Sequence, residues 1–300
     1  MDRKRIGAFV VLAFLMGSCT EDIVIDLEKG EPLIGVEAYF SDEMKCHEAV
    51  LSYTADFYNK DDIRMISGAS VYVTDGVDTV YYHEDLDRQG HYYTDSVAGK
   101  RNTMYRLVVD AAQVDGERVH LFAECFIPDN VEMIDSIAIK PFNGVDDTVP
   151  TTFLNDTIEW VYPYFQSLAD PNIIYTPTVY KNDTLVGDSL GMGTSSMVIP
   201  VGGYAGYYIN GPEMQAANKE IPVYFFRKSE LKEGDRIRLD LASIPSDYMY
   251  FYYSLAMSMG NNPMMGAPAN VATNIQPEGQ AVGWFLVTSV VSVETVFHNN

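Results

Sequence analysis

The sequence predicts a mainly β protein, in which an N-terminal sandwich of the immunoglobulin-like or transthyretin-like type precedes a second β-rich domain with one short helix. Three observations support this prediction. Tyr is frequent, with 21 residues, and aromatic and β-branched residues favour strands. Short runs of such residues alternate with turns rich in Gly, Asn and Asp. Apolar residues make up 47% of the 300 positions and charged residues 21%, so a buried core can form.

Seven strands are expected in the first domain, at residues 33–40, 49–58, 70–74, 79–83, 91–94, 104–110 and 118–126. The clearest turn is Asp75-Gly76, because Gly accepts the positive φ that a tight hairpin requires. Pro128 follows the last of these strands and marks the expected domain boundary.

Longer, Tyr-rich strands are expected after that boundary, at residues 136–140, 158–164, 175–181, 196–201, 204–209, 223–227, 236–242 and 282–296. Ser246 is expected to cap a helix over 247–258, since Asp247 lies in its first turn and Gly260 just past its end. One face of this helix is expected to pack in the core through Met249, Tyr252, Tyr253, Ala256 and Met259. The expected division is a leader at 1–18, a tether at 19–31, a sandwich domain at 32–128 and a C-terminal domain at 129–300.

The first nineteen residues have the pattern of a bacterial lipoprotein signal. Arg3, Lys4 and Arg5 precede an apolar run over residues 6–16, and small residues lead to Cys19. The run is too short to span a bilayer and is typical of a cleaved leader. We expect cleavage before Cys19 and acylation of Cys19; the alternative is an ordinary secretory signal that contains a Cys. Removing residues 1–18 takes away three positive charges and one negative charge, which changes the net charge from -22 to -24.

The negative charge restricts the classes of partner. Asp and Glu number 42, against 20 Lys and Arg. Nucleic-acid binding needs clustered cations that displace counterions, and binding to anionic lipid needs a basic face. The sequence therefore predicts no nucleic-acid partner, and the acyl chain on Cys19 is the only membrane contact expected.

Two further cysteines, Cys46 and Cys125, have two interpretations. In an oxidising compartment they can form a disulfide that closes a long loop. Alternatively, they are two half-buried thiols that act as small apolar side chains. No Cys-x-x-Cys motif is present, so the sequence contains neither a zinc ribbon nor a thioredoxin-like motif.

Several short motifs, in order, resemble those of one Bacteroidetes lipoprotein family, catalogued as domain of unknown function 4249. They are Cys19 with its acidic tether, 32–38 (PLIGVEA), 66–75 (ISGASVYVTD), 90–95 (GHYYTD), 105–109 (YRLVV), 134–137 (IDSI), and Asn274-Ile275 with Gly279 and Gly283. The resemblance implies an outer-membrane lipoprotein at the cell surface, of a kind often encoded beside TonB-dependent receptors. It implies no catalytic residues and no cofactor.

The sequence contains no zincin, nucleophile-elbow, phosphate-loop or dinucleotide-binding motif. His83, Glu84, Asp85 and His91 offer donors for a metal across one hairpin, but a solvated acidic turn is the preferred interpretation. We therefore expect no enzyme activity and assign no catalytic residue, metal site or cofactor.

Asp followed by Ser or Thr and an aliphatic residue occurs seven times, against a chance expectation of about two. This pattern resembles an O-glycosylation motif of exported Bacteroidetes proteins. The alternative is that Asp-Thr and Asp-Ser mark junctions between turns and strands. The candidate acceptors are Thr79, Ser96, Ser136, Thr148, Thr157, Thr184 and Ser189.

Tyr204, Tyr207 and Tyr208 lie in a Gly-rich segment and are a candidate binding surface, since Tyr presents a flat apolar face and a hydroxyl. Packing in the core is the competing interpretation. The loop 261–275, rich in Met, Asn and Pro, is a second candidate contact surface. Three functions are considered: an accessory lipoprotein that binds for, or docks onto, a TonB-dependent transporter; a structural or adhesive subunit of the fimbrial type; and a hydrolase. The first is preferred.

Overall fold

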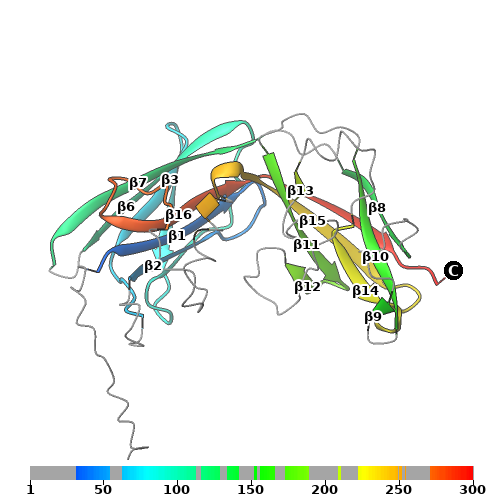
Figure 1. Ribbon diagram of the computed structural model, residues 1–300. Coiled ribbons are helices and arrows are strands. Elements are labelled where there is room, and N and C mark those ends of the chain that lie inside the picture. Colours follow the sequence, from blue (N-terminus) through cyan, green and yellow to red (C-terminus); the bar gives the residue numbers. More distant parts are fainter. Residues whose placement is uncertain are drawn as a thin grey trace, which may run out of the picture. The chain divides into compact units, whose positions relative to one another are not determined.

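The computed structural model describes residues 32–54, 63–112, 116–128, 134–141, 152–153, 156–165, 173–188, 209–210, 222–248, 250–251, 254 and 271–299. All of them belong to one compact unit, Pro32–Asn300. Strands dominate the described residues (Figure 1), arranged as sandwich-like packed sheets; the described part also contains one short helical segment and one 3₁₀ turn. The predicted fold class is confirmed. Among the described residues, no helix is both long and apolar enough to cross a membrane.

The first sheet contains eight strands, and all seven strands predicted for the first domain are present in it. Neighbouring strands are antiparallel, except that β16 runs parallel to β1. The order is β16 (Ala281–Thr288), β1 (Ile34–Ser41), β2 (Glu48–Tyr53), β5 (His91–Thr94), β4 (Thr79–Glu84), β3 (Ser70–Thr74), β6 (Thr103–Ala112) and β7 (Arg118–Ile127).

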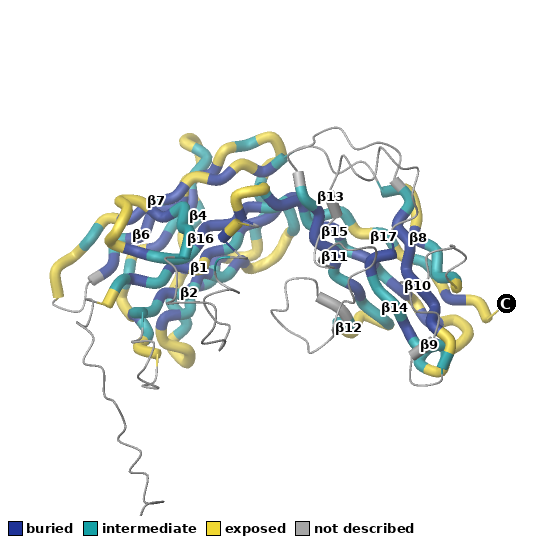
Figure 2. Tube along the Cα trace, in the orientation of Figure 1, coloured by how far each residue is buried: buried dark blue, intermediate teal, exposed yellow. Residues whose placement is uncertain are grey.

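The two ends of this sheet approach each other, which gives it a sandwich-like form. Phe122 of β7 and Gln276, just before β16, exchange backbone hydrogen bonds of 2.9 and 2.7 Å. The Val287 N–H of β16 lies 3.4 Å from the Cys125 sulfur of β7. Buried side chains alternate with more exposed ones along β2, β3, β5 and β7 (Figure 2). The enclosed core includes Val36, Phe40, Leu51, Val73, Leu107, Leu121 and Phe285.

The predicted hairpin turn at Asp75-Gly76 is confirmed, with Gly76 at φ 87°. The Asp75 carboxylate accepts hydrogen bonds from the N–H groups of Val77 and Asp78, at 2.9 and 2.6 Å, and from Lys100 Nζ at 2.9 Å. The Asp78 N–H, then Lys100 and Val77, lower the pKa of Asp75 to about 2. The turn is thus held by local side-chain to backbone bonds, in addition to the positive φ of Gly76 on which the prediction was based.

The second part of the chain forms two facing sheets. One sheet contains β14 (Tyr224–Arg227), β10 (Asp156–Phe165) and β8 (Ile134–Lys140), with β9 (Thr152–Phe153) beside β10. The other sheet contains β12 (Thr184–Asp188), β11 (Ile173–Lys181), β15 (Arg236–Pro245) and β17 (Val290–Val296), with β13 (Ile209–Asn210) beside β11. Side chains from both sheets share one core, which contains Ile137, Val161, Phe226, Val179, Leu239 and Leu241.

One strand differs from the expected domain division. The segment 282–296, expected to have strand character within the C-terminal domain, is two strands separated by Ser289. β16 pairs with β1 in the first sheet, whereas β17 pairs with β15 in the second part. Figure 1 shows β16 beside β1, although the two are far apart in sequence. A parallel pairing between distant segments leaves no local turn signal, so periodicity does not reveal it.

Helical residues lie at 246–248, 250–251 and 254, within the region where a helix was predicted. Ser246 is itself helical, so the helix begins one residue before the predicted start at Asp247, and Ser246 lies inside it and not at its cap. Tyr248 and Phe251 are buried against Trp284 of β16, with ring centroids 5.8 and 5.3 Å from its ring. The face predicted to pack, from Met249 to Met259, lies outside the described residues. Among the residues that are described, Tyr248 and Phe251 provide the core contacts.

Candidate functional site

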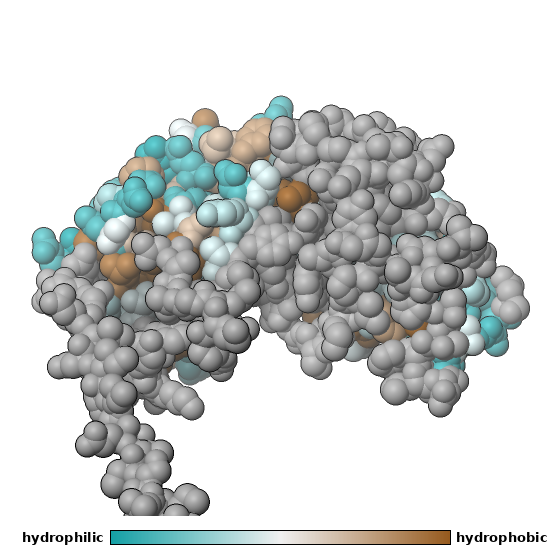
Figure 3. Space-filling model, viewed as in Figure 1, coloured by the Kyte–Doolittle hydropathy of each residue, from teal (hydrophilic) through white to brown (hydrophobic). Residues whose placement is uncertain are grey.

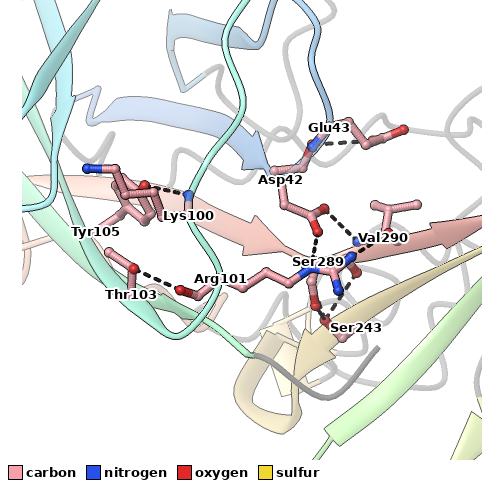
Figure 4. A network of polar contacts seen from close by, with 10 residues as sticks. Asp42, Glu43, Lys100, Arg101, Thr103, Tyr105, Ser243, Ser289 and Val290 are labelled. Atoms are coloured by element: carbon pink, nitrogen blue, oxygen red, sulfur yellow. Dashed lines mark hydrogen bonds and ion pairs between the residues drawn. The ribbon is translucent and has the colours of Figure 1, made fainter. Parts of the chain in front are cut away.

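A network of polar contacts surrounds the residue at which the chain passes from the first sheet to the second part. Asp42 lies directly after β1, and its side chain is 8% exposed. Its carboxylate accepts hydrogen bonds from Arg101 Nε at 2.6 Å and from the Val290 N–H at 2.8 Å. Figure 4 shows Asp42 between these two partners. Asp42 therefore links β1, the loop before β6 and the start of β17, and we call these three residues with Ser243 and Ser289 the polar joint.

Two serines complete the polar joint. Ser243 of β15 and Ser289, between β16 and β17, are both fully buried. Their hydroxyl oxygens are 2.6 Å apart, and the Ser289 N–H donates to Ser243 Oγ at 3.2 Å. The Ser243 N–H also donates to the Ser289 carbonyl at 2.9 Å. These bonds satisfy buried polar groups at the crossing between the sheets, which would otherwise be costly.

The outer face of the first sheet carries a row of apolar side chains across four strands. Cross-strand register places Tyr81 of β4 beside Tyr72 of β3, Tyr72 beside Val108 of β6, and Val108 beside Phe122 of β7. The Tyr72 and Tyr81 rings are 5.6 Å apart and tilted by 48°, and Tyr81 is 56% exposed. We call these four residues the aromatic row.

Hydrogen-bonding side chains flank the aromatic row on both sides. On one side, Arg106 of β6 contacts Glu124 of β7 at 2.7 Å and lies over the Phe122 ring at 4.9 Å. On the other side, Asp110 and His120 occupy the next positions of the same face, with Asp110 Oδ1 and His120 Nδ1 2.8 Å apart. Each acidic group beside the row is thus paired with a basic one, although the chain as a whole has a net charge of -22.

A second polar cluster lies where β2 pairs with β5. Glu48 Oε1 accepts a hydrogen bond from the Tyr93 hydroxyl at 2.7 Å and lies 2.7 Å from His91 Nδ1. Arg88 donates to the Tyr93 hydroxyl at 2.6 Å. Burial opposes ionisation of Glu48, but the bonds from Tyr93 and His91 outweigh it and lower the pKa of this carboxyl.

Of the four residues considered as metal donors across the hairpin, three bind protein groups and the fourth is exposed on its strand. Glu84 accepts hydrogen bonds from the Gly68 and Gly90 N–H groups at 2.8 and 3.3 Å. Asp85 accepts one from the Asp87 N–H, and His91 contacts Glu48. His83 is exposed on β4. In the part of the chain that is described, no group of three or more His, Cys, Asp or Glu side chains is placed to hold a metal.

The two cysteines are both free, and neither is half-buried as the second interpretation had it. Cys46 is exposed and Cys125 is buried. A disulfide between them is not present, since Cys125 points into the first core, where its sulfur meets the Val287 N–H. Burial raises the pKa of the Cys125 thiol to about 11, which keeps it protonated and unreactive.

This arrangement predicts two very different thiol reactivities. In a Cys19→Ala protein, which retains two thiols, Cys46 is expected to react at once with a thiol reagent at pH 8. Cys125 is expected to react only when the protein unfolds, because its thiol is buried and protonated. Mass spectrometry of the modified protein over time measures both, and a Cys46→Ser control should lack the fast phase. A protein with no reactive thiol until reductant is added would contradict the free-thiol assignment.

Of the seven candidate O-glycosylation residues, five fall in the described part of the chain. All five are exposed, so an enzyme could reach them: Thr79, Ser96, Ser136, Thr157 and Thr184. Thr148 and Ser189 lie outside the described residues. The exposure is consistent with either modification or a turn-to-strand role, and glycosylation remains a prediction.

Other predicted site residues lie outside the described part. These are Cys19, the tether, Tyr204, Tyr207 and Tyr208, and the loop 261–275 as far as residue 270. The aromatic row and the polar joint, in contrast, were not anticipated. The row has a sequence signal, because Tyr72 and Tyr81 stand at equal distances from the Asp75-Gly76-Val77-Asp78 turn and a hairpin must place them side by side. The polar joint has no such sequence signal, because Asp42, Arg101, Ser243 and the Ser289-Val290 pair are far apart in sequence.

The fold and these surfaces define the class of protein: a β-sandwich-like protein whose first sheet presents an ordered set of aromatic and paired polar side chains. The chain belongs to the family described as domain of unknown function DUF4249, whose model matches residues 20–294. The resemblance stated from the sequence is therefore confirmed. No curated protein matches the chain significantly.

Two solved structures show a weak likeness to the chain. The FN1–FN3 domains of chicken CNTN1 are 12% identical over 73% of this chain and 64% of that one, with a TM-score of 0.27. An α-L-rhamnosidase from Dictyoglumus thermophilum is 11% identical over 73% of this chain and 28% of that one, with a TM-score of 0.23. The chain thus spans less than two thirds of either of them.

Proposed function

We propose that this protein is a non-enzymatic lipoprotein at the cell surface, anchored in the outer membrane of a Bacteroidetes cell by acylation of Cys19. Its role is to act as an accessory or binding component of a TonB-dependent uptake system. The observation that carries the proposal is the N-terminal pattern: a basic start, a short apolar run, small residues, and then Cys19 with Glu21 and Asp22 behind it. The resemblance described from the sequence motifs implies the same role.

The position of the first described residues fits this role. Strand β1 begins at Ile34, two residues after Pro32, so only the tether at 19–31 separates the lipid from the folded unit. An extended chain spans at most about 3.5 Å per residue, so thirteen residues reach about 45 Å. The sandwich-like unit would stay within that distance of the bilayer, close to the outer loops of a receptor barrel. Its net charge favours a partner with a basic rim, through salt-dependent association.

Purification from native membranes tests both the anchor and the partner. Tagged wild-type protein is expected to enter the detergent phase and to bring a transporter barrel with it, identified by mass spectrometry. Cys19→Ala is expected to leave the detergent phase, because no other membrane contact is proposed. Retention of Cys19→Ala in that phase would refute lipid anchoring. Recovery of a polymer ladder and no barrel would favour the structural or adhesive function over the accessory one.

A further inference from the structure

We propose that the aromatic row, defined above as Tyr81, Tyr72, Val108 and Phe122, is a binding platform for a neutral polysaccharide. The proposal goes beyond the accessory function, because it depends on neither the lipid anchor nor a transporter. Three properties of the face carry it: the exposed ring of Tyr81 beside the half-buried ring of Tyr72, paired polar groups beside them, and a backbone that is already fully used in the sheet.

The spacing suits a polymer that lies across the strands. The two tyrosines of the row lie on the neighbouring strands β4 and β3, and neighbouring strands are about 4.8 Å apart. This interval is close to the length of one pyranose unit in an extended chain. Val108 is buried and the Phe122 ring lies under Arg106, so these two residues extend the apolar base of the row and Tyr81 and Tyr72 supply its stacking rings. Tyr81, at 56% exposure, and the neighbouring Tyr72 present ring faces at adjacent positions. The apolar C–H face of a sugar can stack on such rings, and its hydroxyls remain free for polar contacts.

The flanking side chains supply the polar contacts. Arg106 is held in place by Glu124 and by the Phe122 ring, and a guanidinium has five N–H donors, so donors remain beside the row. Asp110 and His120, on the opposite flank, are fixed by their mutual contact of 2.8 Å. Thr79, the cross-strand partner of Thr74, adds an exposed hydroxyl group beside Tyr81. Fixed donors and acceptors on both sides of a stacking surface match the alternating hydroxyls of a sugar chain.

Charge and topology favour this ligand over others. The carboxylates near the row are paired: Glu124 with Arg106, Asp110 with His120, and Asp75 and Asp78 with Lys100. The described cations next to the tyrosines and Phe122, Lys100 and Arg106, are both held by carboxylates, and cations neutralised in this way do not suit nucleic acid or an anionic polymer. An extended peptide is usually held by backbone bonds at a sheet edge. Here β3, β4 and β6 are paired on both sides, so only side chains are available.

Affinity electrophoresis tests the platform with the mature lipoprotein, solubilised in a detergent without a sugar headgroup. The probes are soluble β-glucan, xylan, α-mannan and starch, with polygalacturonate as the anionic comparison. At least one neutral polysaccharide is expected to retard the wild type. Tyr81→Ala is expected to weaken that binding about tenfold or more, the effect of losing one stacking ring. Because Tyr81 is exposed, its replacement leaves the core intact, and thermal unfolding checks this.

Two control variants make the test specific. Tyr81→Phe keeps the ring and is expected to bind within about threefold of the wild type, which shows that stacking is the main contribution. Tyr250→Ala removes a tyrosine that is 72% exposed in the helical segment and should bind as the wild type does. Retardation by no neutral polysaccharide, retardation by polygalacturonate alone, or equal binding by wild type and Tyr81→Ala would each overturn the proposal. Recovery of the transporter barrel is measured in a separate experiment, so a failure of the polysaccharide proposal can be distinguished from a failure of the proposed accessory function.

Discussion

Gly283→Ala is expected to prevent β16 from pairing with β1 and to lower the free energy of unfolding by about 4 kcal/mol or more. Gly283 has φ +113° and lies opposite Val36 in the parallel ladder. A Cβ atom at this position would lie 1.9 Å from the Val36 carbonyl oxygen and 2.8 Å from its carbonyl carbon. Both are backbone atoms of a central strand, so no side-chain rotation can relieve the overlap.

The control for this variant is Gly279→Ala. Gly279 also has positive φ, at +84°, but a Cβ there meets nothing within 4 Å. Its replacement therefore adds only backbone strain, of about 1 kcal/mol. Urea denaturation of both variants measures the difference, and hydrogen exchange of the β16 amides shows whether the pairing is lost. Equal destabilisation by the two substitutions would mean that close approach of β16 to β1 is not what requires glycine at 283.

The local elements of the first sheet could be predicted because their causes are local. The Asp75-Gly76 turn sets the register of β3 and β4 through hydrogen bonds within four residues of Asp75. The position of β16 could not be predicted in this way. Its partner β1 lies more than two hundred residues earlier, and parallel strands need a long crossover with no sequence signature of its own. Alternation showed that 282–296 forms strand, but not that Ser289 divides it between two sheets.

In the candidate site, too, local contacts could be predicted from the sequence and long-range contacts could not. The aromatic row follows partly from sequence, because a tight hairpin dictates that Tyr72 faces Tyr81. Its extension to Val108 and Phe122 depends on the order β4-β3-β6-β7, which local patterns do not specify. The sequence left open whether Cys46 and Cys125 form a disulfide, for a related reason. Cysteine count and compartment indicate that a bridge can form, whereas its formation depends on where β7 directs Cys125, and that side chain points into the core.

Asp42→Ala is expected to lower the free energy of unfolding by about 2–3 kcal/mol, because it removes two charge-assisted hydrogen bonds from a largely buried carboxylate. The Val290 N–H loses its acceptor, and Arg101 loses the carboxylate that Nε contacts at 2.6 Å. Val290 is the first residue of β17, directly after the crossing at Ser289. The polar joint would thus be weakened where the first sheet continues into the second part.

The neighbouring acidic residue provides a matched control. Glu43 forms an exposed ion pair with Lys45, and such pairs contribute about 0–1 kcal/mol, so Glu43→Ala is expected to change stability little. Denaturation measures both variants, and hydrogen exchange of the Val290 amide is expected to accelerate more in Asp42→Ala than the global change in stability accounts for. A double-mutant cycle with Arg101→Ala then separates the Asp42–Arg101 interaction from the bond to Val290. If Asp42→Ala and Glu43→Ala had the same effect, the burial of Asp42 would not matter, and the polar joint would have to be held by Ser243 and Ser289 alone.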